Sequence, residues 1–257
     1  MRWGPPRLLG HRGACAERPE NTMASFERAV ALGVDVIETD VHLTRDGHVV
    51  VAHDPNGQRA ANRPEAIRDC SLEELRAWDV GWGFVAADGT RPYACQGMRM
   101  PLLREVLEAF PEVAFNVDIK QRRPSMVAPL LEVLRASASQ ERVTLASFHP
   151  AAMREVRARG FTGATALSRD EIVALVFLPR WPARLLVAGQ AVQIPPRTGA
   201  IDLSTRGFIE KCHRMGLWVD YWTINDPLHA EVLLERGADG LISDDPARLQ
   251  SVIARYR

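Results

Sequence analysis

Short runs of β-branched and apolar residues alternate with amphipathic segments along the whole chain, and this alternation limits the fold more than any other feature. Eight runs are predicted as strands, each followed by a segment with helical spacing of its apolar residues. Strands that alternate with helices predict an α/β fold with a parallel sheet. Eight units in 257 residues predict one (β/α)8 TIM barrel domain over residues 1–257, because about 250 residues is typical of that fold. The predicted strands are Arg7–His11, Val34–Val41, Ala114–Lys120, Val143–Phe148, Gly163–Ser168, Ala191–Pro195, Leu217–Thr223 and Gly240–Ser243.

A ninth apolar run, Val49–His53, follows a Thr-Arg-Asp-Gly turn and predicts a hairpin with the second strand. About half of the connection that follows, from about residue 55 to residue 101, is polar or glycine-rich. A connection of this length in a compact domain is usually an active-site lid or a small insertion. We therefore predict a small insertion after the second-strand hairpin.

The segments between the strands carry helix start signals. Asn21 and Thr22 are alternative N-caps for the first helix. Several later segments begin at proline, which is favoured in the first helical turn. The later predicted helices are Met126–Ala136, Pro150–Arg159, Thr205–Met215, Pro227–Arg236 and Pro246–Ala254.

Charge and hydropathy argue against several classes of protein. The chain has 32 lysines and arginines and 32 acidic residues, so it carries no net charge and shows no sign of binding nucleic acid. A membrane-spanning helix needs about 18 apolar residues, and the longest apolar stretch, Ile172–Gly189, is broken by prolines and arginines. The first 13 residues hold no signal-peptide-like stretch. We expect no stable membrane insertion, and the sequence leaves the oligomeric state open.

The four cysteines are widely spaced and form no CxxC motif. This spacing is typical neither of a disulfide framework nor of a thiolate metal site, and it favours a reducing, cytoplasmic location. We expect Cys15 to be an unreactive loop residue, and His42 and His48 to be solvated beside the hairpin turn. The histidines in predicted helices are expected to be structural: His149, His213 and His229.

Three carboxylates fall at the ends of neighbouring predicted strands. Glu38 and Asp40 share one face of their strand because side chains alternate, and Asp118 ends the next strand. In a TIM barrel the carboxyl ends of the strands carry the active site. Converging carboxylates repel one another unless they are protonated or neutralised by a cation, and oxygen ligands favour Mg²⁺ or Ca²⁺ over zinc. Taken singly, each acid could instead be a helix cap or an ion-pair partner.

Basic groups lie at the same predicted rim. Arg12 and Lys120 would supply positive charge for a phosphate group. His11 and His53 are candidates for general acid and base because imidazole titrates near neutral pH. With a divalent cation, these residues would form the parts of a metal-assisted phosphodiester cleavage.

The ordered motifs of the chain resemble those of the glycerophosphodiester phosphodiesterase family. They cover essentially the whole sequence and are far more specific together than a bare His-Arg-Gly. The matching motifs are His11-Arg12-Gly13, Pro19-Glu20-Asn21-Thr22, Glu38-Thr39-Asp40, Thr44-Arg45-Asp46-Gly47, His53-Asp54, Asn116 to Lys120, Trp222-Thr223-Ile224-Asn225 and Asp239 to Pro246.

The resemblance implies a TIM barrel that hydrolyses glycerophosphodiesters to sn-glycerol 3-phosphate and an alcohol with Mg²⁺ or Ca²⁺. It implies metal ligands Glu38, Asp40 and Asp118, catalytic His11 and His53, and substrate-binding Arg12, Lys120 and Trp222. The family usually has Glu-Ile-Lys where this chain has Asp118-Ile119-Lys120. The shorter aspartate would reach a cation through water, or would reach a larger ion.

Two other functions remain open on the sequence. The first is a lysophospholipase D or a sphingomyelinase-D-like lipid phosphodiesterase, for which Ile172–Gly189 and Trp181 would form a lipid-facing edge. A barrel helix with an apolar face is the simpler interpretation of that stretch. The second is a non-catalytic barrel that binds phosphate ligands. Such a barrel would be expected to lose a site histidine or carboxylate, whereas this chain keeps them all.

Overall fold

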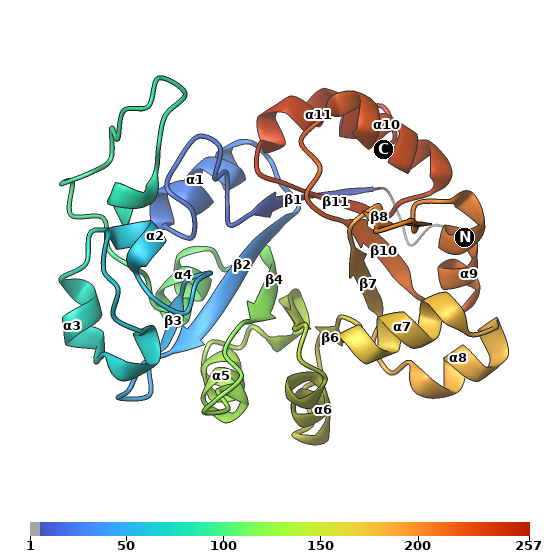
Figure 1. Ribbon diagram of the computed structural model, residues 1–257, viewed down its shortest axis with the longest axis horizontal. Coiled ribbons are helices and arrows are strands. Elements are labelled where there is room, and N and C mark those ends of the chain that lie inside the picture. Colours follow the sequence, from blue (N-terminus) through green and yellow to red (C-terminus); the bar gives the residue numbers. More distant parts are fainter. Residues whose placement is uncertain (1–5) are drawn as a thin grey trace.

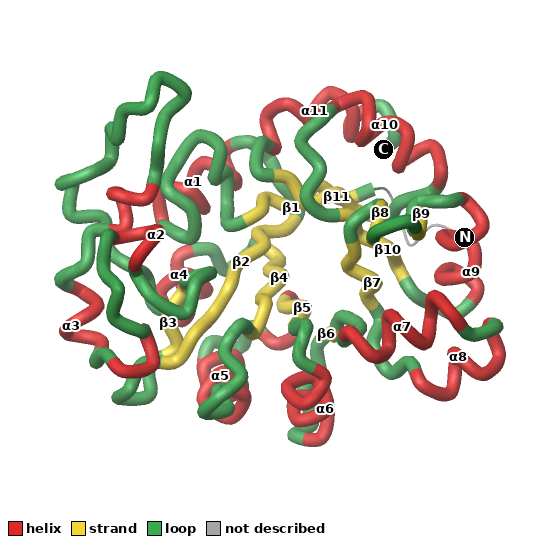
Figure 2. The backbone as a smooth tube through the Cα atoms, viewed as in Figure 1, coloured by secondary structure: helices red, strands yellow, loops and turns green. Residues whose placement is uncertain are grey.

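The computed structural model describes residues 6–257, so the expectation about a signal peptide falls partly on residues 1–5, outside the described part. Eight parallel strands form a nearly closed barrel surrounded by helices, as predicted (Figures 1 and 2). Their order around the sheet is β6-β5-β4-β2-β1-β11-β10-β7. The strands are β1 (Arg7–His11), β2 (Val36–Leu43), β4 (Ala114–Ile119), β5 (Val143–Ala146), β6 (Ala164–Thr165), β7 (Ala191–Ile194), β10 (Trp218–Tyr221) and β11 (Gly240–Ser243).

The first and last strands of the barrel are neighbours. β1 pairs with β11 in parallel from Arg7 opposite Gly240 to Gly10 opposite Ser243. The residues that follow β11 therefore lie beside the end of β1. On the other side of the barrel, β6 and β7 meet through an isolated bridge between Ala166 and Ala191, which leaves the barrel nearly rather than fully closed.

Helices follow the strands where the sequence predicts them. Thr22 is the N-cap of the first helix, and its hydroxyl accepts the Ser25 backbone N–H at 3.2 Å. The predicted apolar stretch Ile172–Gly189 forms two helices instead of one, because Pro179 follows the extended residue Leu178. The helices are α1 (Met23–Ala31), α4 (Leu103–Ala109), α5 (Val127–Ala136), α6 (Pro150–Ala158), α7 (Arg169–Phe177), α8 (Arg180–Leu186), α9 (Arg206–Arg214), α10 (Pro227–Arg236) and α11 (Pro246–Ala254). A short ribbon of β8 (Arg197–Thr198) and β9 (Ile201–Asp202) precedes α9.

The segment between β2 and α4 carries the predicted hairpin and short helices. β3 (Val49–Val51) pairs antiparallel with the end of β2. Loops then connect α2 (Gln58–Ala61), α3 (Leu72–Arg76) and 3-10 turns at Ile67–Asp69 and Val80–Gly83, as the long green tube in Figure 2 shows. This segment has its own apolar cluster, in which Ile67, Leu75 and Trp78 are buried. The cluster fixes the segment against one side of the barrel mouth.

The expectation that His42 is solvated is wrong. β2 continues to Leu43, two residues beyond its predicted end, so His42 lies within the strand and opposite Val50. Its side chain is buried, and Nε2 lies 3.2 Å from the His53 carbonyl oxygen. Burial lowers the pKa of His42. His48, in the turn itself, is exposed as predicted.

Candidate active site

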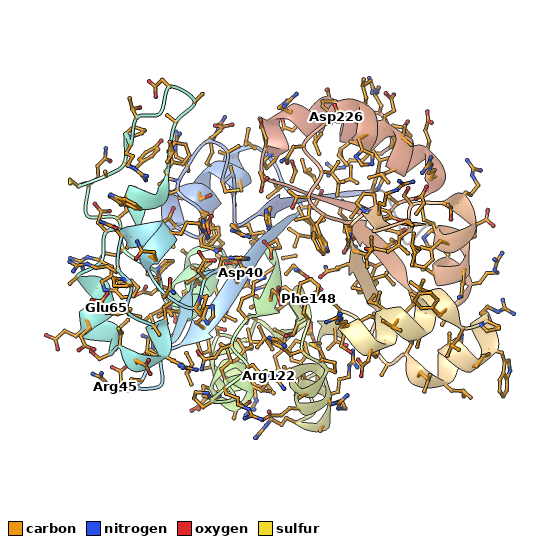
Figure 3. All side chains as sticks on the ribbon, viewed as in Figure 1. Asp40, Arg45, Glu65, Arg122, Phe148 and Asp226 are labelled. Atoms are coloured by element: carbon orange, nitrogen blue, oxygen red, sulfur yellow. The ribbon has the colours of Figure 1, made fainter. Side chains whose placement is uncertain are left out.

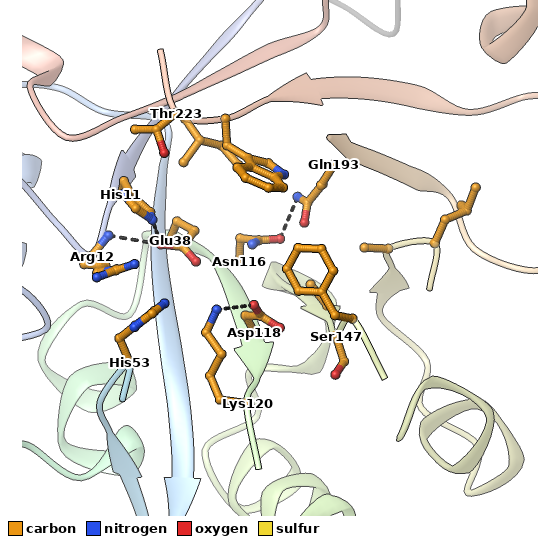
Figure 4. A pocket seen from close by; sticks show the side chains of 16 residues that line it. His11, Arg12, Glu38, His53, Asn116, Asp118, Lys120, Ser147, Gln193 and Thr223 are labelled. Carbon is orange, nitrogen blue, oxygen red and sulfur yellow. Dashed lines mark hydrogen bonds and ion pairs between the residues drawn. The ribbon is translucent and has the colours of Figure 1, made fainter. Parts of the chain in front are cut away.

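A cavity of about 210 Å³ opens at the carboxyl ends of the strands, where a TIM barrel carries its active site (Figure 4). Asp40, labelled on β2 in Figure 3, is buried and does not line it. All the other predicted site residues line the cavity: His11, Arg12, Glu38, His53, Asp118, Lys120 and Trp222. Residues from distant parts of the chain therefore meet as the sequence predicts.

Lys120 lies between two of the buried carboxylates. Its Nζ is 2.9 Å from Asp40 Oδ1 and 2.6 Å from Asp118 Oδ2. Burial raises the pKa of Asp118, although Lys120 opposes that shift. Burial would also raise the pKa of Asp40, but Lys120 and Arg12 lower it below its usual value. Within residues 6–257 no lysine or arginine side chain forms an ion pair with Glu38, and burial together with Asp40 raises its pKa to about 7.

The backbone after β1 turns sharply to place Arg12 over the carboxylates. Arg12 has a φ of 52° and Gly13 a φ of 88°. A Cβ at Gly13 would lie 2.4 Å from Ser25 Oγ, so glycine is required there. The Arg12 backbone N–H donates to Glu38 Oε2 at 3.0 Å, and the Arg12 Nε lies 3.3 Å from Asp40 Oδ2. The His-Arg-Gly motif thus holds two of the three carboxylates.

The Pro-Glu-Asn-Thr motif supports the same groups. The Asn21 side chain donates to Asp40 Oδ2 at 3.0 Å and accepts from Thr39 Oγ1 at 2.7 Å. Glu20 accepts from Arg12 Nη1 at 3.1 Å with both carboxylate oxygens. Burial would raise the pKa of Glu20, but hydrogen bonds and charge from Arg59 and Arg12 lower it. Glu20 therefore links the Arg12 side chain to Arg59.

His11 is oriented by an aspartate at the far end of the chain. Its Nδ1 lies 2.5 Å from Asp244 Oδ1, and its Nε2 lies 3.9 Å from Glu38 Oε2. Asn225 donates to Asp244 Oδ2 at 2.8 Å, which fixes the carboxylate. Burial lowers the pKa of His11, but the hydrogen bond to Asp244 and the charge of Glu38 give a net increase. The Nε2 edge of the ring therefore faces the cavity.

His53 is connected to Arg12 through Asp54, Arg59 and Glu20, of which only Arg59 lies outside the motifs that the sequence singled out. His53 Nδ1 lies 2.7 Å from Asp54 Oδ1, and Arg59 Nε donates to Asp54 Oδ2 at 2.6 Å. Arg59 also donates to both oxygens of Glu20, at 2.6 and 2.7 Å. Arg59 belongs to α2, so the inserted segment helps to position both His53 and Arg12.

The opposite end of the cavity is apolar and more open. Phe148 and Trp222 form an edge-to-face pair with ring centroids 5.9 Å apart. Phe148 is 53% exposed, and Ala146, Leu167 and Ile242 add further apolar lining. This end can accept an apolar or a cationic group without requiring a particular polar partner.

The floor of the cavity is polar. Gln193 Nε2 donates to Asn116 Oδ1 at 2.8 Å and to Asp220 Oδ2 at 3.2 Å. Asp220 also accepts from Arg7 at 2.7 Å. These bonds hold the Gln193 and Asn116 side chains in place at this side of the cavity.

The carboxylates have the chemistry of a site for a hard cation. Asp118 Oδ1 is buried and has no hydrogen-bond partner within residues 6–257. Three acids share a buried volume with one lysine and one arginine, so a divalent cation would offset unbalanced negative charge. Their oxygens do not all lie within 4.8 Å of one another. At least one of the three side chains would therefore have to move, or act through water, for all three to share one ion.

Cys15, His11 and Asp244 form a tighter group, the one set in the described residues whose potential ligand atoms lie within 4.8 Å. Hydrogen bonds explain this group: the Cys15 thiol donates to Asp244 Oδ1 at 3.2 Å. Burial, with the charge of Asp244, raises the pKa of Cys15, so the side chain stays a thiol. This agrees with its predicted unreactive character.

Comparisons with known proteins place the chain among phosphodiesterases. The sequence model of the glycerophosphoryl diester phosphodiesterase family matches residues 11–248. A glycerophosphodiester phosphodiesterase of Caldanaerobacter subterraneus subsp. tengcongensis is 30% identical over 253 residues, which cover 96% of this chain and 98% of the relative. A lysophospholipase D of Mus musculus is 25% identical over 283 residues, which cover 97% of this chain and 87% of that one.

The fold is also that of solved structures. A phosphodiesterase of Oleispira antarctica, solved with the product sn-glycerol-3-phosphate, superposes with a TM-score of 0.78 at 23% identity. The match covers 97% of each chain. At that identity the likeness establishes the barrel fold alone.

Proposed function

The chain belongs to the glycerophosphoryl diester phosphodiesterase family, and we propose from this premise that it hydrolyses glycerophosphodiesters to sn-glycerol 3-phosphate and an alcohol. As a family member it is a phosphoric diester hydrolase. The observation that carries the proposal is the charged end of the cavity, where His11, His53 and Arg12 surround the buried carboxylates and Lys120.

In the proposed reaction, Arg12 and Lys120 bind the oxygens of the phosphate. One of the two histidines accepts the proton of the nucleophile, which is water or the neighbouring glycerol hydroxyl; in the second case a cyclic phosphate forms, and water opens it in a further step to give sn-glycerol 3-phosphate. The other histidine donates a proton to the oxygen of the departing alcohol. Asp244 and Asp54 each hold the Nδ1 side of one ring, which leaves both Nε2 atoms available for proton transfer.

Glu38, Asp40 and Asp118 are the proposed holders of Mg²⁺ or Ca²⁺. When bound, a divalent cation would polarise a phosphate oxygen and stabilise the charge that develops in the transition state. The unpartnered Asp118 Oδ1 and the short reach of that side chain favour a flexible coordination shell, which Ca²⁺ tolerates better than Mg²⁺.

The test is product release from glycerophosphocholine by metal-stripped and metal-reloaded protein. The proposal predicts that chelation abolishes release of sn-glycerol 3-phosphate and that Mg²⁺ or Ca²⁺ restores it. Unchanged release after chelation would contradict the metal requirement. Saturable binding without turnover across glycerophosphodiesters with Mg²⁺, Mn²⁺ and Ca²⁺ would instead support a phosphate-binding barrel.

A second candidate substrate is a lysophospholipid, which the open apolar end with Phe148 and Trp222 would accommodate. Lysophospholipase D relatives of similar length match this chain, and a sphingomyelinase-D-like activity would use the same groups. Turnover of glycerophosphocholine and of lysophosphatidylcholine micelles, measured side by side, separates these substrates. A preference for the micelles would replace the main proposal.

Two further predictions accompany the proposal. Organisation as one domain over residues 1–257 remains our prediction. A cytoplasmic location is also proposed from cysteine usage, since all four cysteines lie in the described residues and are free. Among the helices of residues 6–257, none combines the length and apolar character that a membrane crossing requires.

A further inference from the structure

The outer side of α7 and α8 exposes a cluster of large apolar side chains. The two helices form a pair between β6 and β7 and lie at the edge of the molecule, on the right in Figure 1. The cluster consists of Val173 (49% exposed), Phe177 (67%), Trp181 (75%), Leu185 (71%) and Leu186 (57%). We call these five residues the α7–α8 apolar surface. Exposed apolar clusters on soluble domains commonly mark interaction sites.

This surface is not the result of a loosely packed helix pair. Leu175 and Ala183, on the inner sides of α7 and α8, are fully buried in the barrel's main apolar cluster. The Lys211 ammonium group donates to the Leu175 and Leu178 carbonyl oxygens at the end of α7. Glu171 accepts the Ala188 backbone N–H at 2.8 Å, which ties the end of α8 to the start of α7. The outer side therefore remains exposed although the inner side is firmly anchored.

The unpaired charges on α7 and α8 are positive, because the acidic residues at the start of α7, Asp170 and Glu171, already form ion pairs with Arg154 and Arg157. Residues 172–201 contain no aspartate or glutamate, whereas Arg180 and Arg184 lie on α8 beside Trp181. Both arginines are exposed. Within residues 6–257, neither arginine makes a side-chain hydrogen bond or ion pair, unlike Arg154 and Arg157 on the adjacent helix α6. The surface thus combines exposed apolar groups with two uncompensated positive charges.

We propose that the α7–α8 apolar surface docks the protein on an anionic phospholipid bilayer. Tryptophan, leucine and phenylalanine partition into the boundary between head groups and acyl chains, and arginine is attracted to anionic head groups. The docking is peripheral and agrees with the absence of a spanning helix in the described residues.

A second copy of the chain fits this surface less well. In a twofold dimer the same surface faces itself, so Arg180 and Arg184 of one copy would approach the same residues of the other. No acidic residue from 172 to 201 is available to offset the repulsion. Like charges placed opposite each other disfavour association, whereas an anionic bilayer supplies the missing negative charge.

The inference goes beyond the proposed hydrolysis and does not require it. If both hold, docking brings the cavity to a surface where lysophospholipids and other lipid-derived phosphodiesters are concentrated. The two proposals fail in different assays, because vesicle binding needs no turnover and hydrolysis of glycerophosphocholine needs no vesicle.

The experiment is sedimentation of the full chain with vesicles of phosphatidylcholine mixed with phosphatidylglycerol, and with vesicles of phosphatidylcholine alone. We expect binding to the mixed vesicles that weakens with added salt. Leu185→Asp should reduce the partition coefficient roughly tenfold or more, since burial of a leucine side chain is lost. Arg180→Gln and Arg184→Gln should each reduce it about fivefold.

Leu228→Asp is the matched control. The exposed fraction of Leu228, on α10, is 72%, which nearly equals the 71% of Leu185, and Leu228 lies outside the α7–α8 apolar surface. This variant should bind vesicles like the unmodified chain. Both aspartate variants should keep the activity on glycerophosphocholine in the absence of vesicles, which confirms folding. Equal loss in both variants, or no sedimentation of the unmodified chain, would overturn the proposal. A dimer in light scattering that Leu185→Asp dissociates would also overturn it, in favour of a second copy.

Discussion

The two ends of the cavity are built in opposite ways. At the charged end every group is buried or bonded to a neighbour: Lys120 links Asp40 to Asp118, and Arg59 links Asp54 to Glu20. At the apolar end, Phe148 is 53% exposed and makes an edge-to-face contact with Trp222. Proton transfer needs groups held within narrow limits, whereas binding an alcohol group needs only surface and room. From this difference we propose that the charged end sets the rate and that the apolar end sets affinity for the alcohol.

The largest expected effect is at the histidines of the charged end. His11→Ala and His53→Ala should each reduce kcat for glycerophosphocholine by about 10²–10⁴-fold, the usual size of general acid–base catalysis. The measurement is steady-state release of sn-glycerol 3-phosphate at saturating metal. His48→Ala, at an exposed histidine of the β2–β3 turn, should keep full activity. Retained activity in either site variant would remove that histidine from the mechanism.

An intermediate effect is expected at Arg59, which touches no lining group of the charged end directly and acts as a positioning residue. Arg59→Met removes charge-assisted bonds to Glu20 and Asp54. Each such bond contributes about 1.5–3 kcal/mol, so kcat/KM should fall roughly 10- to 100-fold. Arg59→Lys should keep a higher kcat/KM than Arg59→Met.

Arg63 provides the control, because it is exposed in the same inserted segment and makes no side-chain ion pair or hydrogen bond in the part of the chain described. Arg63→Met should leave kcat/KM unchanged. If Arg59→Met also leaves kcat/KM unchanged, the hydrogen bonds of Arg59 to Asp54 and Glu20 do not contribute to catalysis.

A smaller effect is expected at the apolar end. Phe148→Ala removes the edge-to-face contact with Trp222, and such pairs contribute about 0.5–1.5 kcal/mol. The KM for glycerophosphocholine should rise about 2- to 12-fold while kcat changes little. Steady-state kinetics that determine kcat and KM separately test this prediction. A fall in kcat with KM unchanged would contradict the proposal that the apolar end sets affinity for the alcohol and the charged end sets the rate.

The smallest effect concerns stability beside the apolar end. Burial would raise the pKa of Glu171, but hydrogen bonds from Arg157 and Ser168 lower it below its ordinary value. A carboxylate with a lowered pKa stabilises the fold above its unfolded pKa, about 4.3, and this contribution disappears as pH falls through the folded pKa. Arg157 also binds the Ala166 carbonyl oxygen at the cavity wall.

Urea unfolding of the unmodified chain and of Glu171→Gln, measured from neutral to acidic pH, tests whether the Glu171 carboxylate stabilises the fold more at neutral than at acidic pH. The difference in free energy of unfolding should be largest near pH 7 and should shrink below about pH 4. Glu210→Gln, at an exposed residue of α9, should show no comparable trend. A difference in free energy of unfolding that grows as the pH falls would contradict a stabilising Glu171 carboxylate.

Local patterns in the sequence were sufficient to predict much of the charged end. Alternation along β2 put Glu38 and Asp40 on one face, and the register of β2 with β4 brings Asp40 opposite Asp118. The barrel itself followed from the alternation of strands and helices, and β1 and β11 begin and end where predicted. Periodicity carries this information because it depends on neighbours a few residues apart.

The partners that orient the histidines depend on contacts that periodicity cannot show. His11 and Asp244 are 233 residues apart, and the pairing of β1 with β11 joins them. Closure of a barrel implies that the first and last strands are neighbours, so Asp244 could have been proposed from its place after the last strand. Arg59 gave no such signal, because it lies in an insertion whose path over the mouth depends on its own apolar cluster.

The exposure of the α7–α8 apolar surface likewise needed the structure. An apolar stretch such as Ile172–Gly189 has the same composition whether its outer face meets solvent or another element. The break at Pro179 and the packing of Leu175 and Ala183 inward decide which side chains remain outside.

Cation binding at the charged end is the most direct test of the central claim that this end is a metal-dependent reaction centre. Titration of the metal-free protein with Mn²⁺, followed by the electron paramagnetic resonance signal of the free ion, measures binding without turnover. Glu38→Gln keeps the acceptor for the Arg12 backbone N–H but removes the charge. We predict that the unmodified chain binds Mn²⁺ and that Glu38→Gln loses both this binding and the hydrolysis of glycerophosphocholine. Hydrolysis by the Glu38→Gln variant at the unmodified rate, or by metal-free protein, would contradict it.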